Sequence, residues 1–296
     1  MVDEIRQLRL RRGVYAAMGR LEVFLASAGE IPRILEEIGR LREETFRQVG
    51  EGTGNAVDLD RFDAGYLHLF LWDHATAEVA GAYRLGCTDV LLASGGAGAL
   101  YTTTLFEFES TFLNSLNPAL ELGRSFVTLK YQRSIHALAL LWRGIGRFIT
   151  ERPQYARLFG PVSISGQYSA VSQELMVRFL RNHRQDESSR GWIKPMHPYQ
   201  PIDIGSISAR LRSIEEVSAA VSQTEADGKG IPVLLKQYLR LNATLLEFSC
   251  DPDFSNALDA LVMVDLREAP AEILRRYLGN NGYNALVSND MRCLAC

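Results

Sequence analysis

Several charged side chains stand within or beside segments that otherwise have the apolar, β-rich composition of buried strands. They are Arg42, Asp58, Asp60, Asp63, Arg84, Glu121 and Arg124. Charges that a fold buries must be paired or must do chemistry, because an isolated buried charge is very costly. Such a set can form a structural salt-bridge network between a helix and a sheet, or an active site. For Glu121 we favour the catalytic role, as a carboxylate that accepts a proton.

Gly123 separates two of these residues within the strand-like run ALELGRSFVT. In a regular strand Glu121 and Arg124 would point to opposite faces, because their separation is odd. A β-bulge at Gly123 would bring both to one face, and glycine inside a strand often marks such a bulge. We therefore expect an irregular strand here, at a place where a sheet can open to admit a ligand.

The segment that follows, LKYQRSI, leads from this strand into a helix. The first turn of a helix has free backbone N–H groups and the positive end of its dipole, which suit a phosphate. Lys130 and Arg133 add full positive charges, and Ser134 stands just before the expected helix. A pantetheine phosphate would fit, although another anion would fit as well and a solvated turn is the structural alternative.

The spacing of apolar residues along the chain predicts an α/β fold. Strands are expected at residues 21–26, 66–72, 78–85, 119–128, 158–165, 244–249 and 258–264, and helices at residues 31–49, 135–150, 170–183, 207–223, 232–241 and from 270 onwards. Residues 86–118 and the proline-rich residues 191–205 are expected to be irregular. Alternating helices and strands indicate one mixed central sheet flanked by helices.

Composition restricts the classes of partner. The 296-residue chain has 32 Lys and Arg against 35 Asp and Glu, a net charge of −3, so no nucleic-acid partner is expected. The sequence shows neither an apolar leader nor an apolar run of the ~20 residues that a membrane span needs. We expect a cytoplasmic protein with reduced cysteines. The histidines lack the spacing of metal ligands, so no metal site is expected.

Taken in order, these motifs resemble those of known acyltransferases. ELGRSFV at 121–127 resembles the Glu-x-Ser-Arg-Phe strand of acyl-homoserine-lactone synthases, which also share the order of the motifs around Arg42, Asp60, Arg84 and Glu121. The chain is more similar still to bacterial haemolysin-like proteins, a family that includes ornithine-lipid N-acyltransferases and N-acyl amino acid synthases. The motifs concerned are RLREETFR, DLDRFD, AYRL, ELGRSFV, LLWRGIGRF, LFGPVSIS, LLKQYLRL and DPDFSNALDALVMVDL, and they span about residues 20 to 280.

The resemblance implies an N-acetyltransferase-like (GNAT) fold. It also implies transfer of a long-chain acyl group from acyl carrier protein or acyl-coenzyme A to the amine of an amino acid or similar small acceptor. Glu121 would be the general base or would position a water, and the residues shaping the site would be Arg42, Asp60, Asp63, Arg84 and Arg124. Ile135 stands where the phosphate loop of N-acetyltransferases usually has glycine, which favours a carrier protein as donor. Gly123 replaces the serine of the lactone synthases, and we expect no lactone product.

Three parts are expected along the chain. Residues 1–20 form a basic arm, residues 21–280 the acyltransferase domain, and residues 281–296 a C-terminal tail. The arm, with its four arginines at 6, 9, 11 and 12, is either solvated or placed against anionic lipid at the inner membrane or an acidic carrier protein. Within the acyltransferase domain, residues 184–206 could join two pseudo-halves.

The expected chemistry is direct aminolysis of a thioester. Glu121, alone or through a water, would take the proton of the amine, and backbone N–H groups near Phe126 and Val127 would stabilise the oxyanion. No G-x-S-x-G motif or Cys–His pair indicates a covalent intermediate. The expected donor-binding residues are Phe126, Val127, Lys130, Arg133 and Ser134. The acyl chain would lie in the opened sheet, lined by aromatic residues of 66–72 and 101–112.

Two alternatives stay open. O-acylation of lysophospholipid is suggested by His68 and Asp73, which fit the H-x-x-x-x-D pattern of glycerolipid acyltransferases. Their odd separation on a strand, however, would point them to opposite faces. The other alternative is a non-catalytic module that holds a lipid or an acyl carrier.

Overall fold

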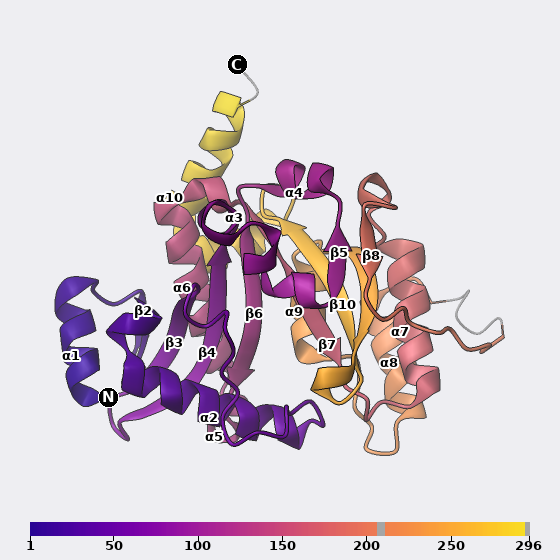
Figure 1. Cartoon of the computed structure of the whole chain (residues 1–296), viewed down its shortest axis with the longest axis horizontal. Coiled ribbons are helices and arrows are strands. Elements are labelled where there is room, and N and C mark those ends of the chain that lie inside the picture. The colour runs from indigo at the N-terminus through magenta and orange to yellow at the C-terminus, as the bar shows by residue number, and fades with distance from the viewer. Residues whose placement is uncertain (206–210, 294–296) are drawn as a thin grey trace.

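The computed structural model describes residues 1–205 and 211–293. Its centre is an eight-stranded sheet in the order β1-β2-β3-β4-β6-β7-β10-β9 (Figure 1). The strands are β1 (Ala16–Met18), β2 (Leu21–Ser27), β3 (Leu67–Asp73), β4 (Glu78–Cys87), β6 (Leu120–Val127), β7 (Arg157–Ile164), β9 (Thr244–Asp251) and β10 (Ala257–Asp265). Neighbours are antiparallel except β6 and β7, which are parallel. The prediction of a mixed central sheet is therefore confirmed.

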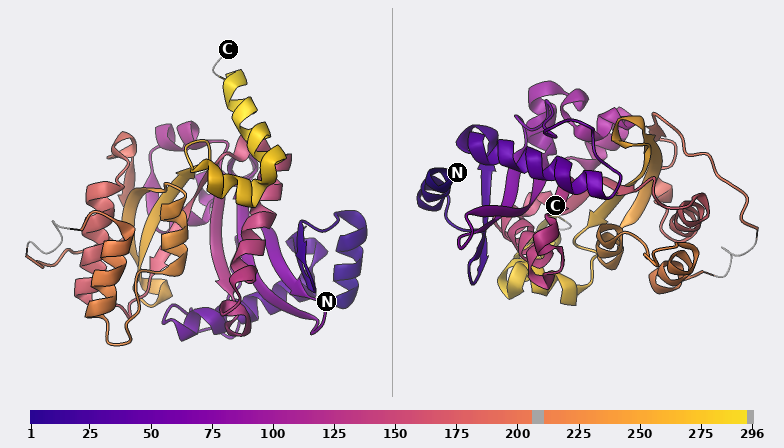
Figure 2. Two further views of the ribbon diagram at one scale, coloured as in Figure 1. Left: turned by 180° about the vertical axis from the view of Figure 1, so that it is seen from behind. Right: turned by 90° about the horizontal axis from the view of Figure 1, so that it is seen from below.

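One face of the sheet is covered mainly by α2 (Pro32–Gln48), which Figure 2 shows lying across the strands. Pro32 suits the first turn, where its missing N–H is not needed, and Ile34, Ile38 and Phe46 bury an apolar stripe against the sheet. The expected basic arm begins with a helix, α1 (Val2–Arg11), which buries Ile5 and Leu8 on this side.

The opposite face carries α6 (Ile135–Glu151), α7 (Ala170–His183), α8 (Ile214–Thr224), α9 (Val233–Arg240) and α10 (Ala271–Cys293). Ser134 caps α6, because its side chain accepts a hydrogen bond from the N–H of His136 at 3.3 Å. The helix α10 continues through most of the expected tail and changes direction at Gly279, whose φ is 70°. None of the helices in the described ranges is long and apolar enough to cross a membrane.

α10 packs against both α6 and α9. A Cβ at Gly146 of α6 would overlap the backbone of Tyr277, so the two helices approach very closely there. The hydroxyl of Tyr277 accepts a hydrogen bond from Gln237 of α9 at 2.7 Å. The ring of Trp142 packs between Tyr238 and Tyr277, with centroids 5.5 and 5.7 Å away. This contact ties the helix that follows β6 to the helix that precedes β9.

Two stretches expected to be irregular are regular in part. Residues 86–118 contain α3 (Thr88–Gly95), β5 (Phe106–Phe108) and α4 (Ser110–Leu116), and residues 191–205 contain β8 (Ile193–Pro195), which pairs with β5. Strands of three residues are too short for a period-two pattern to be recognised. The helix expected at 207–223 begins at Ile214, and residues 206–210 lie outside the described part of the chain.

The sheet opens at its centre, between β6 and β7. These strands pair only through Leu120 with Leu158 and Glu121 with Phe159, although both strands continue well beyond that point. Gly160 stands where they separate, and a Cβ there would overlap the carbonyl oxygen of Leu122. The rest of β6 therefore leaves one edge without a strand partner.

Candidate active site

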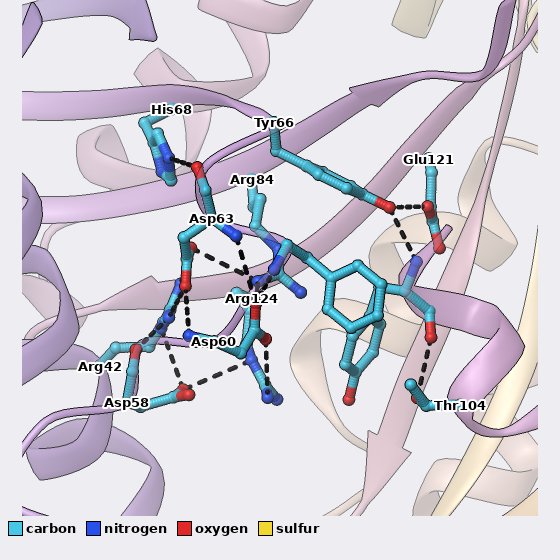
Figure 3. A network of polar contacts seen from close by, with 12 residues as sticks. Arg42, Asp58, Asp60, Asp63, Tyr66, His68, Arg84, Thr104, Glu121 and Arg124 are labelled. Carbon is cyan, nitrogen blue, oxygen red and sulfur yellow. Dashed lines mark hydrogen bonds and ion pairs between the residues drawn. The ribbon is translucent and has the colours of Figure 1, made fainter. Parts of the chain in front are cut away.

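A buried arginine on α2 begins a network of ion pairs on one face of the sheet (Figure 3). Arg42 Nε lies 3.0 Å from Asp58 Oδ2, and its Nη2 lies 3.0 Å from Asp63 Oδ2. All three side chains are almost fully buried. Although burial opposes it, the hydrogen bond from Arg42 holds the pKa of Asp63 well below its usual range. Asp63 therefore stays ionised beside this arginine.

Two arginines of the sheet continue the network. Arg84 of β4 lies 2.6 Å from Asp60, and Arg124 of β6 contacts Asp58 at 3.4 Å and Asp60 at 3.6 Å. The ring of Tyr101 lies over both guanidinium groups, 5.0 Å from Arg84 and 4.9 Å from Arg124. The structure thus brings six of the charged residues singled out from the sequence into one ion-pair network: Arg42, Asp58, Asp60, Asp63, Arg84 and Arg124.

Glu121 lies beside this network but has partners of its own. Its carboxylate accepts hydrogen bonds from the hydroxyl of Tyr66 and from the N–H of Thr102, the latter at 2.7 Å. The N–H of Tyr101 in turn donates to the Tyr66 hydroxyl at 2.8 Å. Glu121 is 1% exposed, and burial raises its pKa. It therefore holds the backbone that carries the Tyr101 ring.

The predicted irregularity of β6 is present. Ala82 pairs with Phe126 and Arg84 with Gly123, so that Arg124 and Ser125 together face Tyr83 alone. Arg124 is the residue of the bulge whose backbone is left-handed, with a φ of 48°. Glu121 and Arg124 consequently lie on the same face, as Figure 3 shows. The bulge is one residue beyond the predicted Gly123.

A cavity of about 680 Å³ fills the opening between β6 and β7. Its apolar and aromatic lining includes Phe46, Tyr83, Tyr101, Leu122, Phe126, Val127, Leu138, Pro161, Val162, Leu234, Tyr238 and Phe254. Of the aromatic segments expected to line it, 101–112 contributes Tyr101, and 66–72 contributes nothing. That expectation was wrong for 66–72 because β3 lies two strands away from the opening.

The residues expected to bind the donor divide into two groups. Phe126, Val127 and Ser134 line the cavity. Lys130 and Arg133 do not. Lys130 lies in the short helix α5 (Leu129–Gln132) and Arg133 directly follows it; both are exposed, and Lys130 pairs with Glu78.

Val127 presents its backbone to the opening. Its carbonyl accepts a hydrogen bond from the side chain of Gln132 at 3.0 Å, while the next N–H, of Thr128, donates to Ala80 of β4 at 3.0 Å. Because successive N–H groups of a strand point to opposite edges, the N–H of Val127 points away from β4. It is thus placed to donate to a group bound in the cavity.

Two carboxyl groups of the cavity were not predicted from the sequence. Asp259 of β10 is 2% exposed and accepts a hydrogen bond from Ser163 Oγ at 2.7 Å. Burial raises the pKa of Asp259 to about 7 and that of Glu51, which follows α2, to about 8. The available signal was the single acidic residue inside the apolar strand ALDALVMV.

The H-x-x-x-x-D pair is not an active site in this fold. His68 bonds to the carbonyl of Asp63 at 2.9 Å on the network face, and burial lowers its pKa. Asp73, at the far end of β3, accepts from the hydroxyl of Tyr131 at 2.7 Å. The two side chains therefore have separate partners on opposite faces, as their odd separation predicted.

The chain matches the model of a known protein family and is similar in amino-acid sequence to two known enzymes. Residues 41–143 match the model of the acetyltransferase (GNAT) domain. A glycine Nα-acyltransferase of Bacteroides thetaiotaomicron is 31% identical over 246 residues, which cover 77% of this chain and 71% of the relative. A glycine Nα-acyltransferase of Phocaeicola vulgatus is 31% identical over 245 residues, covering 77% and 74%. The chain belongs to this family of GNAT N-acyltransferases.

Among solved structures, a coenzyme A-dependent acyl-homoserine lactone synthase, BjaI, aligns with 86% of this N-acyltransferase and 88% of its own chain, at a TM-score of 0.43 and 13% identity. The matched GNAT domain holds α2 from residue 41 onwards, the ion-pair network and the bulged strand β6. β7 and β10, which supply Ser163 and Asp259, lie beyond it.

Proposed function

We propose that this N-acyltransferase moves a long-chain fatty acyl group from a thioester to the amino group of glycine or a similarly small amino acid. The observation that carries the proposal is the cavity between β6 and β7. Its apolar walls suit an acyl chain. Arg124, Glu51 and Asp259 also line it and offer both signs of charge to a zwitterion. The names of the two relatives support glycine as the acceptor.

An acyl carrier protein is the donor we favour. Phe126, Val127 and Ser134 line the cavity near the start of α6, where a pantetheine arm could enter. Lys130 and Arg133 stand outside on the exposed surface, within the same turn of chain. A basic surface beside the entrance suits an acidic carrier. Acyl-coenzyme A would offer the same thioester with a smaller head group.

The reaction we propose is aminolysis without a covalent intermediate. The thioester carbonyl would accept a hydrogen bond from the N–H of Val127, which stabilises the negative charge that develops on the oxygen. The amine, once deprotonated, forms the C–N bond, and the C–S bond then breaks to release the thiol. The apolar cavity holds the acyl chain still, which keeps the carbonyl within reach of the amine.

Glu121 supports this chemistry by position in our proposal. Its hydrogen bonds to Tyr66 and Thr102 fix the chain at Tyr101, whose ring covers Arg84 and Arg124. The remaining network residues, Arg42, Asp60 and Asp63, would hold that arginine pair in place from the side of α2. The alternative expected from the sequence is that Glu121 is the general base. This role requires Glu121 to reach the amine, whereas Glu121 does not line the cavity.

Mass spectrometry of reaction mixtures tests the function. Purified protein is incubated with palmitoyl-acyl carrier protein or palmitoyl-coenzyme A, with glycine, ornithine and a lysophospholipid. We expect N-palmitoylglycine, and a loss of roughly 10²-fold or more in its rate for Glu121→Gln, because a displaced Tyr101 misplaces the reacting groups. Glu107→Gln, at an exposed glutamate of β5, is the matched control and should keep full activity.

Each other product has a definite meaning. Formation of a palmitoyl ester of the lysophospholipid would show that the protein catalyses O-acylation instead of N-acylation. Formation of palmitoyl-ornithine without palmitoylglycine would show that ornithine is the acceptor and that the reaction is still N-acylation. If no thioester is consumed, the protein is a binding module and the proposal is wrong.

A further inference from the structure

Asp259 has one carboxylate oxygen fixed and one free. Oδ1 accepts the hydrogen bond from Ser163, directly across from it on β7. In the described residues 1–205 and 211–293, Oδ2 has no hydrogen-bond or ion-pair partner, although the side chain is only 2% exposed. Asp259 lines the cavity. A buried carboxylate oxygen that faces a cavity without a partner is prepared for a cationic or N–H donor.

Glu51 lines the same cavity, and its carboxyl group also lacks a partner within the described part of the chain. It makes no hydrogen bond through its side chain and no ion pair within the described part of the chain. It also interacts electrostatically with Asp259, so the two carboxyl groups face a common space. Its segment is held in place by Ser165 and Ser255, whose hydroxyls donate to the carbonyls of Val49 and Gly52. Two carboxyl groups that lack a cation of the protein can share one from a ligand.

We propose that Asp259, assisted by Glu51, binds the ammonium group of the acceptor and takes its proton. The inference rests on the function proposed above and assigns the base of that reaction to β10 rather than to Glu121. Asp259 touches the cavity, whereas Glu121 is enclosed by Tyr66 and Thr102. Ser163 acts as a positioning residue, because its hydroxyl fixes the direction in which Oδ2 points.

Two protons leave the amine nitrogen in the proposed step. The ammonium gives one proton to Oδ2 of Asp259, and the nitrogen lone pair that is freed forms the C–N bond with the thioester carbonyl. The C–S bond breaks and its electron pair leaves on sulfur, which takes the second proton of the nitrogen. The products are an amide and a thiol, and Asp259 returns its proton to solvent.

The pH dependence of the step depends on all the groups around Asp259. Those that interact with it are Glu51 after α2, Tyr101, Arg124 on β6, and Cys250 and Asp251 on β9. Burial and Asp251 favour the protonated form of Asp259, and Arg124 opposes them. We therefore expect amide formation by the wild-type protein to fall as the pH drops below neutrality, because a protonated carboxyl accepts no proton.

Kinetics on Asp259→Asn tests the inference. Asparagine keeps an oxygen for Ser163 but cannot act as the base, so kcat for amide formation should fall by about 10²–10⁴-fold while the KM of the acyl donor stays unchanged. The acidic limb of the pH profile should be replaced by a rise that follows the deprotonation of free glycine. Asp265→Asn is the matched control, since Asp265 lies at the other end of β10 and pairs with Arg267 outside the cavity. Circular dichroism verifies folding of each variant.

Calorimetric titration with glycine separates this inference from the proposed function. At neutral pH wild-type protein should bind glycine much more tightly than Asp259→Asn does, whereas acetate, which lacks the ammonium, should show no such difference between the two proteins. Equal binding of glycine by both proteins, or none by the wild type, overturns the inference, as does an Asp259→Asn variant with unchanged kinetics. If the wild type binds glycine through Asp259 but forms no amide, the proposed function fails and the amine site stands.

Discussion

Arg42 and Asp259 show two different ways in which this fold places a buried charge. Arg42 is 1% exposed but has two carboxylates in contact, Asp58 and Asp63. Asp259 is 2% exposed and has only a serine hydroxyl. The first arrangement satisfies the charge within the protein. The second leaves a carboxylate without its counter-ion, which lowers the stability of the folded state.

The stability of the wild type should therefore depend on the proton of Asp259. Burial raises the pKa of Asp259 in the folded chain to about 7, above the ordinary aspartate value of 3.8, so the folded chain holds a proton that the unfolded chain releases between those values. The free energy of unfolding contributed by this group consequently falls as the pH rises through that window. Asp259→Asn removes the titration and should be more stable than the wild type at pH 8, by about 2–4 kcal/mol, with a much smaller difference near pH 4.

Urea denaturation of both proteins at the two pH values measures this difference. Asp265→Asn should show no such gain at pH 8. A stability difference that is the same at both pH values would contradict the assignment of an uncompensated charge to Asp259.

At the scale of elements, the ion-pair network joins four parts of the chain on one face of the sheet. Arg42 belongs to α2, the three aspartates to the segment before β3, Arg84 to β4 and Arg124 to the bulge of β6. Each arginine contacts two of the aspartates, so removing one member leaves charges without partners. The network thus determines where the bulge lies relative to α2.

Replacing Arg42 should lower the free energy of unfolding far more than replacing Arg40, which lies on the exposed side of the same helix. Arg42→Met leaves Asp58 and Asp63 buried and without their main cation, and should lower the free energy of unfolding by about 3–5 kcal/mol. Arg40→Met removes exposed pairs with Glu37 and Glu44 and should lower it by less than ~1 kcal/mol. Chemical denaturation compares them, and losses of equal size would show that the network is not a structural tie.

The elements themselves were largely predictable from the sequence, and the reasons are local. The apolar stripe of α2 has a clear helical period, β3 and β4 are β-rich apolar runs on either side of a short turn, and Gly123 indicated the irregular strand. The pairing of β5 with β8 could not be predicted, because each strand has three residues and the 84 residues 109–192 separate them. The candidate site was likewise predictable only in part. Charges within strands indicated the network, whereas the meeting of Glu51 and Asp259 depends on where β10 lies beside the end of α2.

At the scale of the whole molecule, a group of five strands and a group of three meet at one short contact. β6 and β7 share two residue pairs, and the cavity occupies the remainder of the space between them. The apolar walls of this cavity are buried fully only when a ligand fills it. An acyl chain should therefore act as part of the hydrophobic core.

Thermal unfolding in the presence of a donor tests this view. Palmitoyl-coenzyme A should raise the Tm in proportion to the logarithm of its concentration, with about 2.7 kcal/mol of stabilisation at a hundred times its Kd. Acetyl-coenzyme A has the same head group but no long chain, and should raise the Tm much less. Equal shifts with both would mean that the acyl chain binds elsewhere.

The position of α10 has a consequence for how the specificity of such an enzyme can change. This helix packs against both α6 and α9, which carry Leu138, Leu234 and Tyr238 along the wall of the cavity, yet no described residue of α10 lines the cavity itself. A bulkier or smaller side chain at the contact between Gly146 and Tyr277 would move the two walls apart or together. Evolution, or an engineer, can therefore adapt this enzyme to fatty acids of another size by substitutions that never meet the substrate.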